Sequence, residues 1–443
     1  MSKSGNLNEH SVGYALFRVS APMSIGIFGA LLVGLADAFF LARFSSNALT
    51  AVGFIYPVIV TLTSLSIGLG AGTSTVVSQA LGRGEEDGKQ RMTLHAMMLG
   101  LILSIVTAAL FFVSAPWLFH HMGASAQVLE AIMEYAFWWS LSFPFLVVSM
   151  SLNAVYRAAG RSEIAAATML GQAILNIALT PLLIFGWGVV PELGVAGAGL
   201  ATFLARAAGF TAIIIFAVLQ RDVRLNNDPF TDLWPSLKQI GRVAAPAALS
   251  NAINPAGMAA VTAAVAVVAE SAVAGFGAAT RVQSLLFLPM LALSSGIGPV
   301  VGQAWGAEKT ERAQNAVRLS FVACAAYGAA LALVLILFAG PIVALVAQDP
   351  KAAEYGATYL RFVGLSFFGY GILVTGNAAM NARDRAVWSM AISAGRIAVI
   401  YIPFAWLGVM VFGFSGVLAA AIAANVFGAL GAIMACRSVG LLR

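Results

Sequence analysis

The sequence predicts an all-α integral membrane protein with twelve transmembrane helices, arranged as two six-helix repeats around a central cleft. Three observations predict this fold class: a very apolar composition, apolar stretches of spanning length along the whole chain, and an internal repeat. Of the 443 residues, 60% are hydrophobic and only 9% are charged, whereas soluble domains carry about 25% charged residues. Because so few charges cannot cover a chain of this length with a polar surface, lipid must surround it.

The apolar stretches are each about 20 residues long or longer, which is the length that crosses a bilayer as a helix. They cannot be strands of a barrel, because none shows the alternation of apolar and polar residues that barrel strands require. We expect spans at 16–42, 49–80, 92–115, 131–156, 164–189, 195–219, 243–269, 273–305, 316–347, 355–381, 387–412 and 415–436.

The basic residues predict the orientation of these helices. Seventeen Lys and Arg residues fall on one side of the predicted spans, and only Arg43 and Lys351 fall on the other. By the positive-inside rule, both termini lie in the cytoplasm, and we expect a multi-pass protein of a bacterial inner (plasma) membrane. The net charge of +6 does not indicate nucleic-acid binding, because the basic residues lie between apolar segments and not along one face.

The internal repeat has a constant offset of 224 residues. The matched pairs include Arg18 with Arg242, Pro22 with Pro246, Gln79 with Gln303, Asn153 with Asn377, and Arg161 with Arg385. Because each repeat holds six spans, both copies enter the bilayer from the same side, with a cleft between them. This architecture suits alternating access by rocking of the lobes, although a duplicated scaffold or a channel is the alternative.

The repeat divides the chain into an N-terminal lobe (1–219), a cytoplasmic linker (220–241) and a C-terminal lobe (242–443). Within the linker we expect a short amphipathic helix that carries Leu233 and Trp234 and is capped by Asp228 or Thr231.

One of the eighteen acidic residues, Asp37, lies inside a predicted span and away from its ends. A carboxylate at such a position costs about 2.5–3.5 kcal/mol on insertion scales. Removal from water disfavours the charged form, so Asp37 is a candidate for reversible protonation. The alternative is that Asp37 extends outward to water or makes only a local polar contact.

Three other polar residues are predicted at the depth of Asp37. Asp37 precedes Arg43, at the outer helix end, by six residues, or about 9 Å. Asn176, Thr180 and Thr202 lie in the outer halves of the fifth and sixth spans. Together the four residues predict a site for a proton or a small cation. Alternatively, the Asn and Thr side chains bond only across helices or to their own backbone.

Five motifs follow one another along the chain: GLADAFFLARFSSNALTAVGF, IGLGAGTSTVVSQALGRG, NAVYRAAGRSEIAA, ILNIALTPLLIFG and GVAGAGLATFLAR. In this order they resemble the multidrug and toxic compound extrusion (MATE) family, and the DinF-like branch more than the NorM-like branch. The resemblance covers nearly the whole chain and includes both repeats.

The resemblance implies a secondary active efflux transporter that exports amphipathic, often cationic drugs by antiport with H⁺ or Na⁺. It also implies that Asp37 is the cation-coupling residue and that Asn176 and Thr202 match polar positions near it. Some relatives carry a second acid where this chain has Thr180, and NorM-like members carry acids where it has Asn254 and Tyr370. A single carboxylate suffices for a proton, so we favour H⁺ coupling; Na⁺ coupling and a lipid-linked sugar flippase are the alternatives.

Further expectations concern the substrate and the remaining charges. Methionines are adaptable and could line a drug cavity, and the repeated asparagines serve either substrate or packing. The candidate substrate residues are Met23, Met150, Asn153, Met258, Tyr370 and Asn377. Arg361 and Arg396 lie within spans, where extension to the membrane surface is the expected arrangement. We expect a monomer in contact with membrane lipids, with no cofactor, no metal site and no enzymatic activity.

Overall fold

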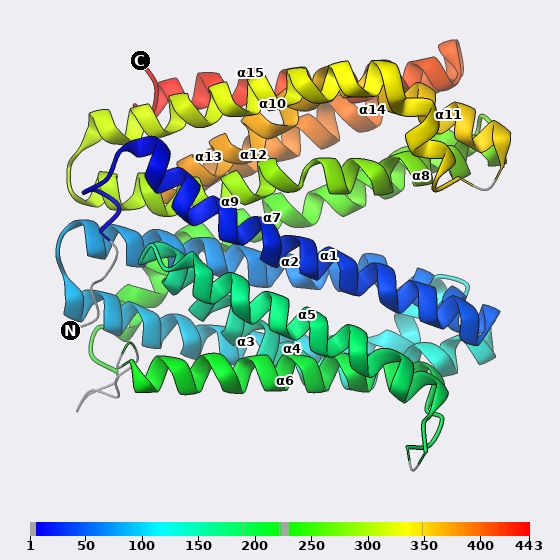
Figure 1. Cartoon of the computed structure of the whole chain (residues 1–443), viewed down its shortest axis with the longest axis horizontal. Coiled ribbons are helices and arrows are strands. Elements are labelled where there is room, and N and C mark those ends of the chain that lie inside the picture. Colours follow the sequence, from blue (N-terminus) through cyan, green and yellow to red (C-terminus); the bar gives the residue numbers. More distant parts are fainter. Residues whose placement is uncertain (1–5, 189, 221, 223–229, 348) are drawn as a thin grey trace.

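The computed structural model describes residues 6–188, 190–220, 222, 230–347 and 349–443, and its regular secondary structure is helical. In Figure 1, α2–α6 form the lower part of the molecule and α8–α15 form the upper part, with α1 crossing between them. The helices of the N-terminal lobe are α1 (Val12–Phe44), α2 (Ser46–Gly82), α3 (Glu86–His121), α4 (Ala126–Ala158), α5 (Ser162–Phe185) and α6 (Gly194–Leu219).

The helices of the C-terminal lobe are more often interrupted. They are α7 (Leu233–Ala266), α8 (Glu270–Leu286), α9 (Leu288–Gly306), α10 (Thr310–Ala344), α11 (Pro350–Val363), the 3₁₀ turn η1 (Gly364–Ser366), α12 (Phe367–Ala382), α13 (Ala386–Ala394), the π-helical η2 (Gly395–Tyr401), α14 (Ile402–Phe412) and α15 (Phe414–Ser438). Pro403, just after η2, cannot donate to the helical ladder, which is consistent with the wider turn before it.

Within the described residues, ten helical units are long and apolar enough to cross a membrane, and α8 with α9 forms an eleventh that bends by 44°. α7 lies along α2 and corresponds to the remaining predicted span, 243–269. Three predicted spans are each broken in the structure, namely α8–α9, α11–η1–α12 and α13–η2–α14. The prediction of an all-helical membrane protein with two six-helix repeats is confirmed.

The linker differs from the expectation. Asp228 lies outside the described residues, and the chain from Leu233 onward forms the first turns of α7 and not a separate amphipathic helix. Asp232, and not Thr231, is the residue before the helix; it adopts φ 55° and makes no side-chain capping bond. The division of the chain into lobes and linker stays a prediction.

Both termini lie at the same end of the bundle (Figure 1), and at that end the two lobes meet through a matched pair of contacts. Gln79 Nε2 donates to the backbone oxygen of Ala382 at 2.8 Å. Its counterpart in the repeat, Gln303, donates through Nε2 to the backbone oxygen of Ala158 at 2.7 Å. Each glutamine therefore reaches from its own lobe to the end of a helix of the other lobe. We call this contact the interlobe seam.

Two glycines allow the seam to form. A Cβ at Gly82 would overlap the backbone oxygen of Gln303, and a Cβ at Gly306 would overlap that of Gln79. Gly82 and Gly306 occupy equivalent positions in the two repeats. The backbones of α2 and α9 can thus approach only because both positions lack a side chain.

A buried ionic cluster holds the end of the N-terminal lobe against the start of the linker. Asp222 Oδ1 lies 3.2 Å from Lys89 Nζ, and its Oδ2 lies 3.3 Å from Arg161 Nη1. Asp222 and Lys89 are each only 7% exposed. Because charges this deeply buried are tolerated only with partners, Asp222 secures the connection after α6 to α3 and α5.

Replacing Asp222 by alanine is expected to lower the stability of the purified protein by about 3–5 kcal/mol, because it removes the carboxylate that faces the buried Lys89 and the half-buried Arg161. The measurement is the thermal melting curve in detergent. The matched control is Glu311→Ala, which breaks the exposed pair of Glu311 with Arg443 (3.2 Å; 80% and 77% exposed) and should change the free energy by less than about 1 kcal/mol. Equal melting temperatures for the two variants would contradict the expectation.

Candidate functional site

The four predicted coupling residues meet in one cluster inside the N-terminal lobe. Asp37 on α1 is 8% exposed, and Thr180 on α5 is fully buried beside it. Thr180 Oγ1 lies 3.0 Å from Asp37 Oδ1. Asn176, one helical turn before Thr180, donates through Nδ2 to Thr202 Oγ1 on α6 at 3.2 Å. The structure thus joins α1, α5 and α6 through these side chains.

The Thr180 hydroxyl has a choice of acceptor. Besides Asp37, it lies 2.9 Å from the backbone oxygen of Asn176. A hydroxyl carries one proton, so it can donate to only one of these oxygens at a time. A charged Asp37 accepts that proton, whereas a neutral Asp37 can itself donate to Thr180 and release the hydroxyl toward Asn176. The α1–α5 contact therefore depends on whether Asp37 carries a proton.

The sequence interpretation missed Arg206, which also belongs to this cluster. Arg206 lies on α6, one turn after Thr202, and its Nη1 donates to Ser142 Oγ on α4 at 2.8 Å. Its guanidinium lies 5.7 Å from the ring centroid of Trp139, and its charge interacts with that of Asp37. A lone arginine in the middle of a predicted span was the indication available in the sequence.

The cluster combines several oxygen atoms with one group that can gain or lose a proton. Its oxygen atoms come from one carboxylate, two hydroxyls and an amide, with the positive Arg206 nearby. Among the described residues, no group of three or more His, Cys, Asp or Glu could hold a metal ion. Asp37 supplies one carboxyl group, which is enough to bind and release a proton, and the surrounding oxygen atoms are of the kind that a hard cation takes as ligands.

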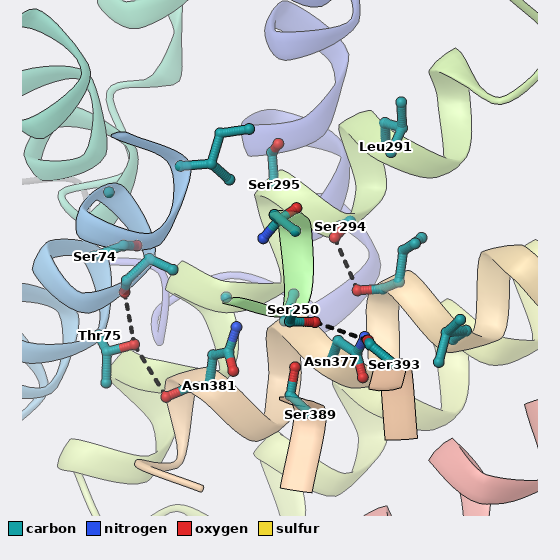
Figure 2. A pocket seen from close by; sticks show the side chains of 18 of the residues that line it. Ser74, Thr75, Ser250, Leu291, Ser294, Ser295, Asn377, Asn381, Ser389 and Ser393 are labelled. Atoms are coloured by element: carbon teal, nitrogen blue, oxygen red, sulfur yellow. Dashed lines mark hydrogen bonds between the residues drawn. The ribbon is translucent and has the colours of Figure 1, made fainter. Parts of the chain in front are cut away.

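A second polar region lies between the lobes. It is a cavity of about 220 Å³, lined by residues of α2, α4, α7, α9, α12, α13 and η2. Figure 2 shows its hydroxyl and amide side chains. Ser250 Oγ and Ser393 Oγ lie 2.7 Å apart, and Asn377 Nδ2 donates to Ser393 Oγ at 3.0 Å.

The cavity lies where the two repeats face each other. Several lining residues form pairs at the repeat offset of 224, among them Gly70 with Ser294, Ser74 with Gly298, and Arg157 with Asn381. Equivalent residues of both repeats can line one space only near the axis that relates the two halves. The central cleft expected from the repeat therefore corresponds to this cavity.

Two of the six candidate substrate residues line the cavity, and the other four do not. Tyr370 and Asn377 line the cavity. Met23 packs against Ala165 and Ala292, and Met258 packs on the C-terminal core. Met150 and Asn153 lie on α4 but are not among the lining residues.

Arg396 does not extend to the membrane surface, and that expectation is wrong. It lines the cavity, donating through Nη1 to Asn254 Oδ1 and through Nη2 to Asn425 Oδ1, each at 3.3 Å. Its position in the π-helical η2, and not at a span end, is the physical reason, because the side chain projects from mid-helix toward α7 and α15. π-helical turns often mark functional sites.

Comparison with known proteins supports the same architecture. A family model described as MatE matches residues 22–182 and 246–407. The chain belongs to the MATE family. The two matched segments begin at Pro22 and Pro246, which are paired in the internal repeat. The predicted family is confirmed, whereas its assignment to the DinF-like branch stays a prediction. Proteins of this family are membrane transporters of small molecules.

Two similar proteins carry different names. A protein of Shewanella oneidensis named "FAD transporter" is 34% identical over 415 residues, which cover 92% of this chain and 91% of that protein. The "Probable multidrug resistance protein NorM" of Thermotoga maritima is 25% identical over 386 residues, 86% of this chain and 82% of that protein.

Solved structures share the whole fold. The Vibrio cholerae MATE transporter VcmN in the bent form has a TM-score of 0.90 and 25% sequence identity, and the match covers 98% of this chain and 99% of that one. A multidrug resistance MATE family transporter of the MOP superfamily, in an outward-facing conformation, has a TM-score of 0.91 at 25% identity and 99% coverage of both chains.

Proposed function

We propose that this MATE-family protein is a secondary active exporter that exchanges its substrate for H⁺ across the plasma membrane, with Asp37 as the proton carrier. The observation that carries the proposal is the alternative hydrogen bonding of Thr180, which lies within 3.0 Å of Asp37 and 2.9 Å of the Asn176 carbonyl oxygen. The MatE match favours an exporter over a lipid-linked sugar flippase.

The proton would act on the packing of three helices. While Asp37 is charged, it accepts from Thr180, which links α1 to α5, and its charge attracts that of Arg206 on α6. When Asp37 takes up a proton, the attraction to Arg206 disappears and the Thr180 hydroxyl becomes available to Asn176. A change that favours one arrangement of α1 over another biases the equilibrium between the two conformations of the lobes.

The test uses inside-out membrane vesicles that contain the full-length protein, with ethidium and flavin mononucleotide as probes. We expect accumulation of at least one probe when the lumen is acidic, and its loss when nigericin dissipates the pH gradient. A Na⁺ gradient without a pH gradient should give the signal of vesicles lacking the protein. Accumulation driven by a Na⁺ gradient alone would show that Na⁺, and not H⁺, is the coupling ion. No accumulation under either gradient would refute the proposal that the protein is an exporter.

Two substrate classes are candidates for this exporter. Amphipathic cations are the class expected from the resemblance and from relatives named for multidrug resistance. A flavin dinucleotide is the second, since the Shewanella relative named for FAD is 34% identical along nearly the whole chain. The charge of the interlobe cavity bears on this choice.

A further inference from the structure

The interlobe cavity carries two positive charges and no negative one among the described residues that line it. Arg157 comes from α4 of the N-terminal lobe, and Arg396 comes from η2 of the C-terminal lobe. No Asp or Glu is among the lining residues. Asp37, the acid inside the membrane, lies in the separate N-terminal cluster with Thr180. The cavity is therefore positively charged.

Arg157 has no partner for its charge among the described residues. Its guanidinium makes no hydrogen bond or ion pair with them, and no opposite charge acts on it. The guanidinium lies beside Gly70 on α2, where a Cβ would be in ordinary van der Waals contact with Arg157 Nη2 at 3.9 Å. Arg157 is half-buried and lines the cavity, and a partly desolvated guanidinium without a partner is costly, so an anion in the cavity would stabilise it.

Arg396 is oriented but not neutralised. Its two hydrogen bonds go to the amide oxygens of Asn254 and Asn425, at 3.3 Å each, and neither amide carries charge. Its Nε is buried without a hydrogen-bond partner. The guanidinium also lies 5.6 Å from the ring centroid of Tyr370, which helps to hold its plane. The arrangement leaves the positive charge available to a ligand.

The repeat argues against a purely structural reason for these charges. The position equivalent to Arg157 in the second repeat is Asn381, and the position equivalent to Arg396 in the first is Gln172. In each case the other copy of the scaffold has a neutral amide. The fold therefore forms without an arginine at these positions, and both arginines line the shared cavity.

We propose that Arg157 and Arg396 bind the phosphate or carboxylate group of an amphipathic organic anion in the interlobe cavity. Arginine suits this group because its planar donors match two oxygen atoms at once. Serine and asparagine side chains around the cavity offer further hydrogen bonds (Figure 2). Tyr370 lines the cavity with its ring stacked on that of Phe287, the ring centroids 4.2 Å apart, and offers an aromatic surface for the rest of the ligand. A cation would meet two like charges.

This inference rests on the proposed function only for the statement that the bound anion is exported. Its binding test is independent of any gradient. It uses purified full-length protein in a neutral detergent and three flavins that share one ring system: riboflavin without phosphate, flavin mononucleotide and FAD. Tetraphenylphosphonium serves as the cationic probe. Equilibrium dialysis gives each dissociation constant.

We expect the two phosphorylated flavins to bind at least about tenfold more tightly than riboflavin, and tetraphenylphosphonium to bind more weakly than both. Arg157→Gln and Arg396→Gln should each weaken flavin mononucleotide about tenfold and leave riboflavin unchanged. The control is Arg318→Gln, which removes an exposed arginine on α10 and should change nothing. Unchanged binding in both cavity variants, or tighter binding of the cation, would overturn the proposal.

A phosphate group can also come from a lipid, and a second arm separates the sources. Phosphatidylglycerol is added to the detergent, with phosphatidylcholine as the comparison. If neither lipid displaces flavin mononucleotide, the result supports a soluble substrate. If the unmodified protein retains phosphatidylglycerol, both arginine variants lose it, and no flavin binds, the site holds a lipid head group. If both arginine variants retain the lipid as the unmodified protein does, and no flavin binds, the proposed anion site is overturned. Flavin binding without proton-driven transport would refute the proposed function alone.

Discussion

Replacing Asp37 by asparagine is expected to reduce proton-driven accumulation of the substrate to the level of vesicles without the protein. Asparagine has nearly the same shape and can still accept the hydrogen bond from Thr180, which now lies 3.0 Å from Asp37 Oδ1. It cannot gain or lose a proton at physiological pH, so the hydrogen bonds of Thr180 no longer change during the cycle. The measurement is substrate accumulation in inside-out vesicles with an acidic lumen.

Two further measurements separate lost coupling from lost folding. The Asp37→Asn protein should bind the substrate with unchanged affinity, because the interlobe cavity is distinct from the Asp37 cluster. Its melting temperature should be equal or higher, since a buried carboxylate costs about 2.5–3.5 kcal/mol within a membrane. The control is Asp87→Asn, which neutralises an exposed acid at the start of α3. Full proton-driven transport by the Asp37 variant would exclude Asp37 as the carrier.

Replacing Gly306 by alanine is expected to reduce transport at least about tenfold, because it separates the lobes at the interlobe seam. The added Cβ would overlap the backbone oxygen of Gln79, and backbone atoms cannot move aside as a flexible side chain can. The bond from Gln303 to Ala158 lies at the same seam and would be lost with it. Gly82→Ala should have the same effect, since a Cβ there overlaps the carbonyl oxygen of Gln303.

The seam variants predict a change of conformation that can be observed directly. A cysteine introduced by Ala382→Cys, at the buried seam residue whose backbone oxygen accepts from Gln79, should react faster with a maleimide when Gly306→Ala is also present. The control is Gly171→Ala on α5, where a Cβ would meet nothing within 4 Å. Alanine is favoured over glycine in a helix by about 1 kcal/mol, so the control should be neutral or stabilised. Equal labelling and equal transport in the Gly306 and Gly171 variants would show that the seam does not limit the cycle.

The sequence by itself determined the fold class and four members of the Asp37 cluster. Hydropathy locates the spans because lipid cannot satisfy backbone hydrogen bonds, so every segment of spanning length must be helical. The fixed rise of a helix converts residue counts into depth. That relation was sufficient to place Asp37, Asn176, Thr180 and Thr202 at one level, where the structure joins them. The repeat similarly predicted a central cleft.

Only the tertiary structure decided which helix faces meet. In a membrane, residues that face lipid and residues that face other helices are equally apolar, so hydropathy does not reveal the partners of a side chain. Arg396 was therefore expected at the membrane surface but lies in the interlobe cavity, and Met23 packs between α5 and α9. Arg206 and the seam of Gln79 and Gln303 likewise depend on rotations of helices about their axes, which only the packing of all the helices determines.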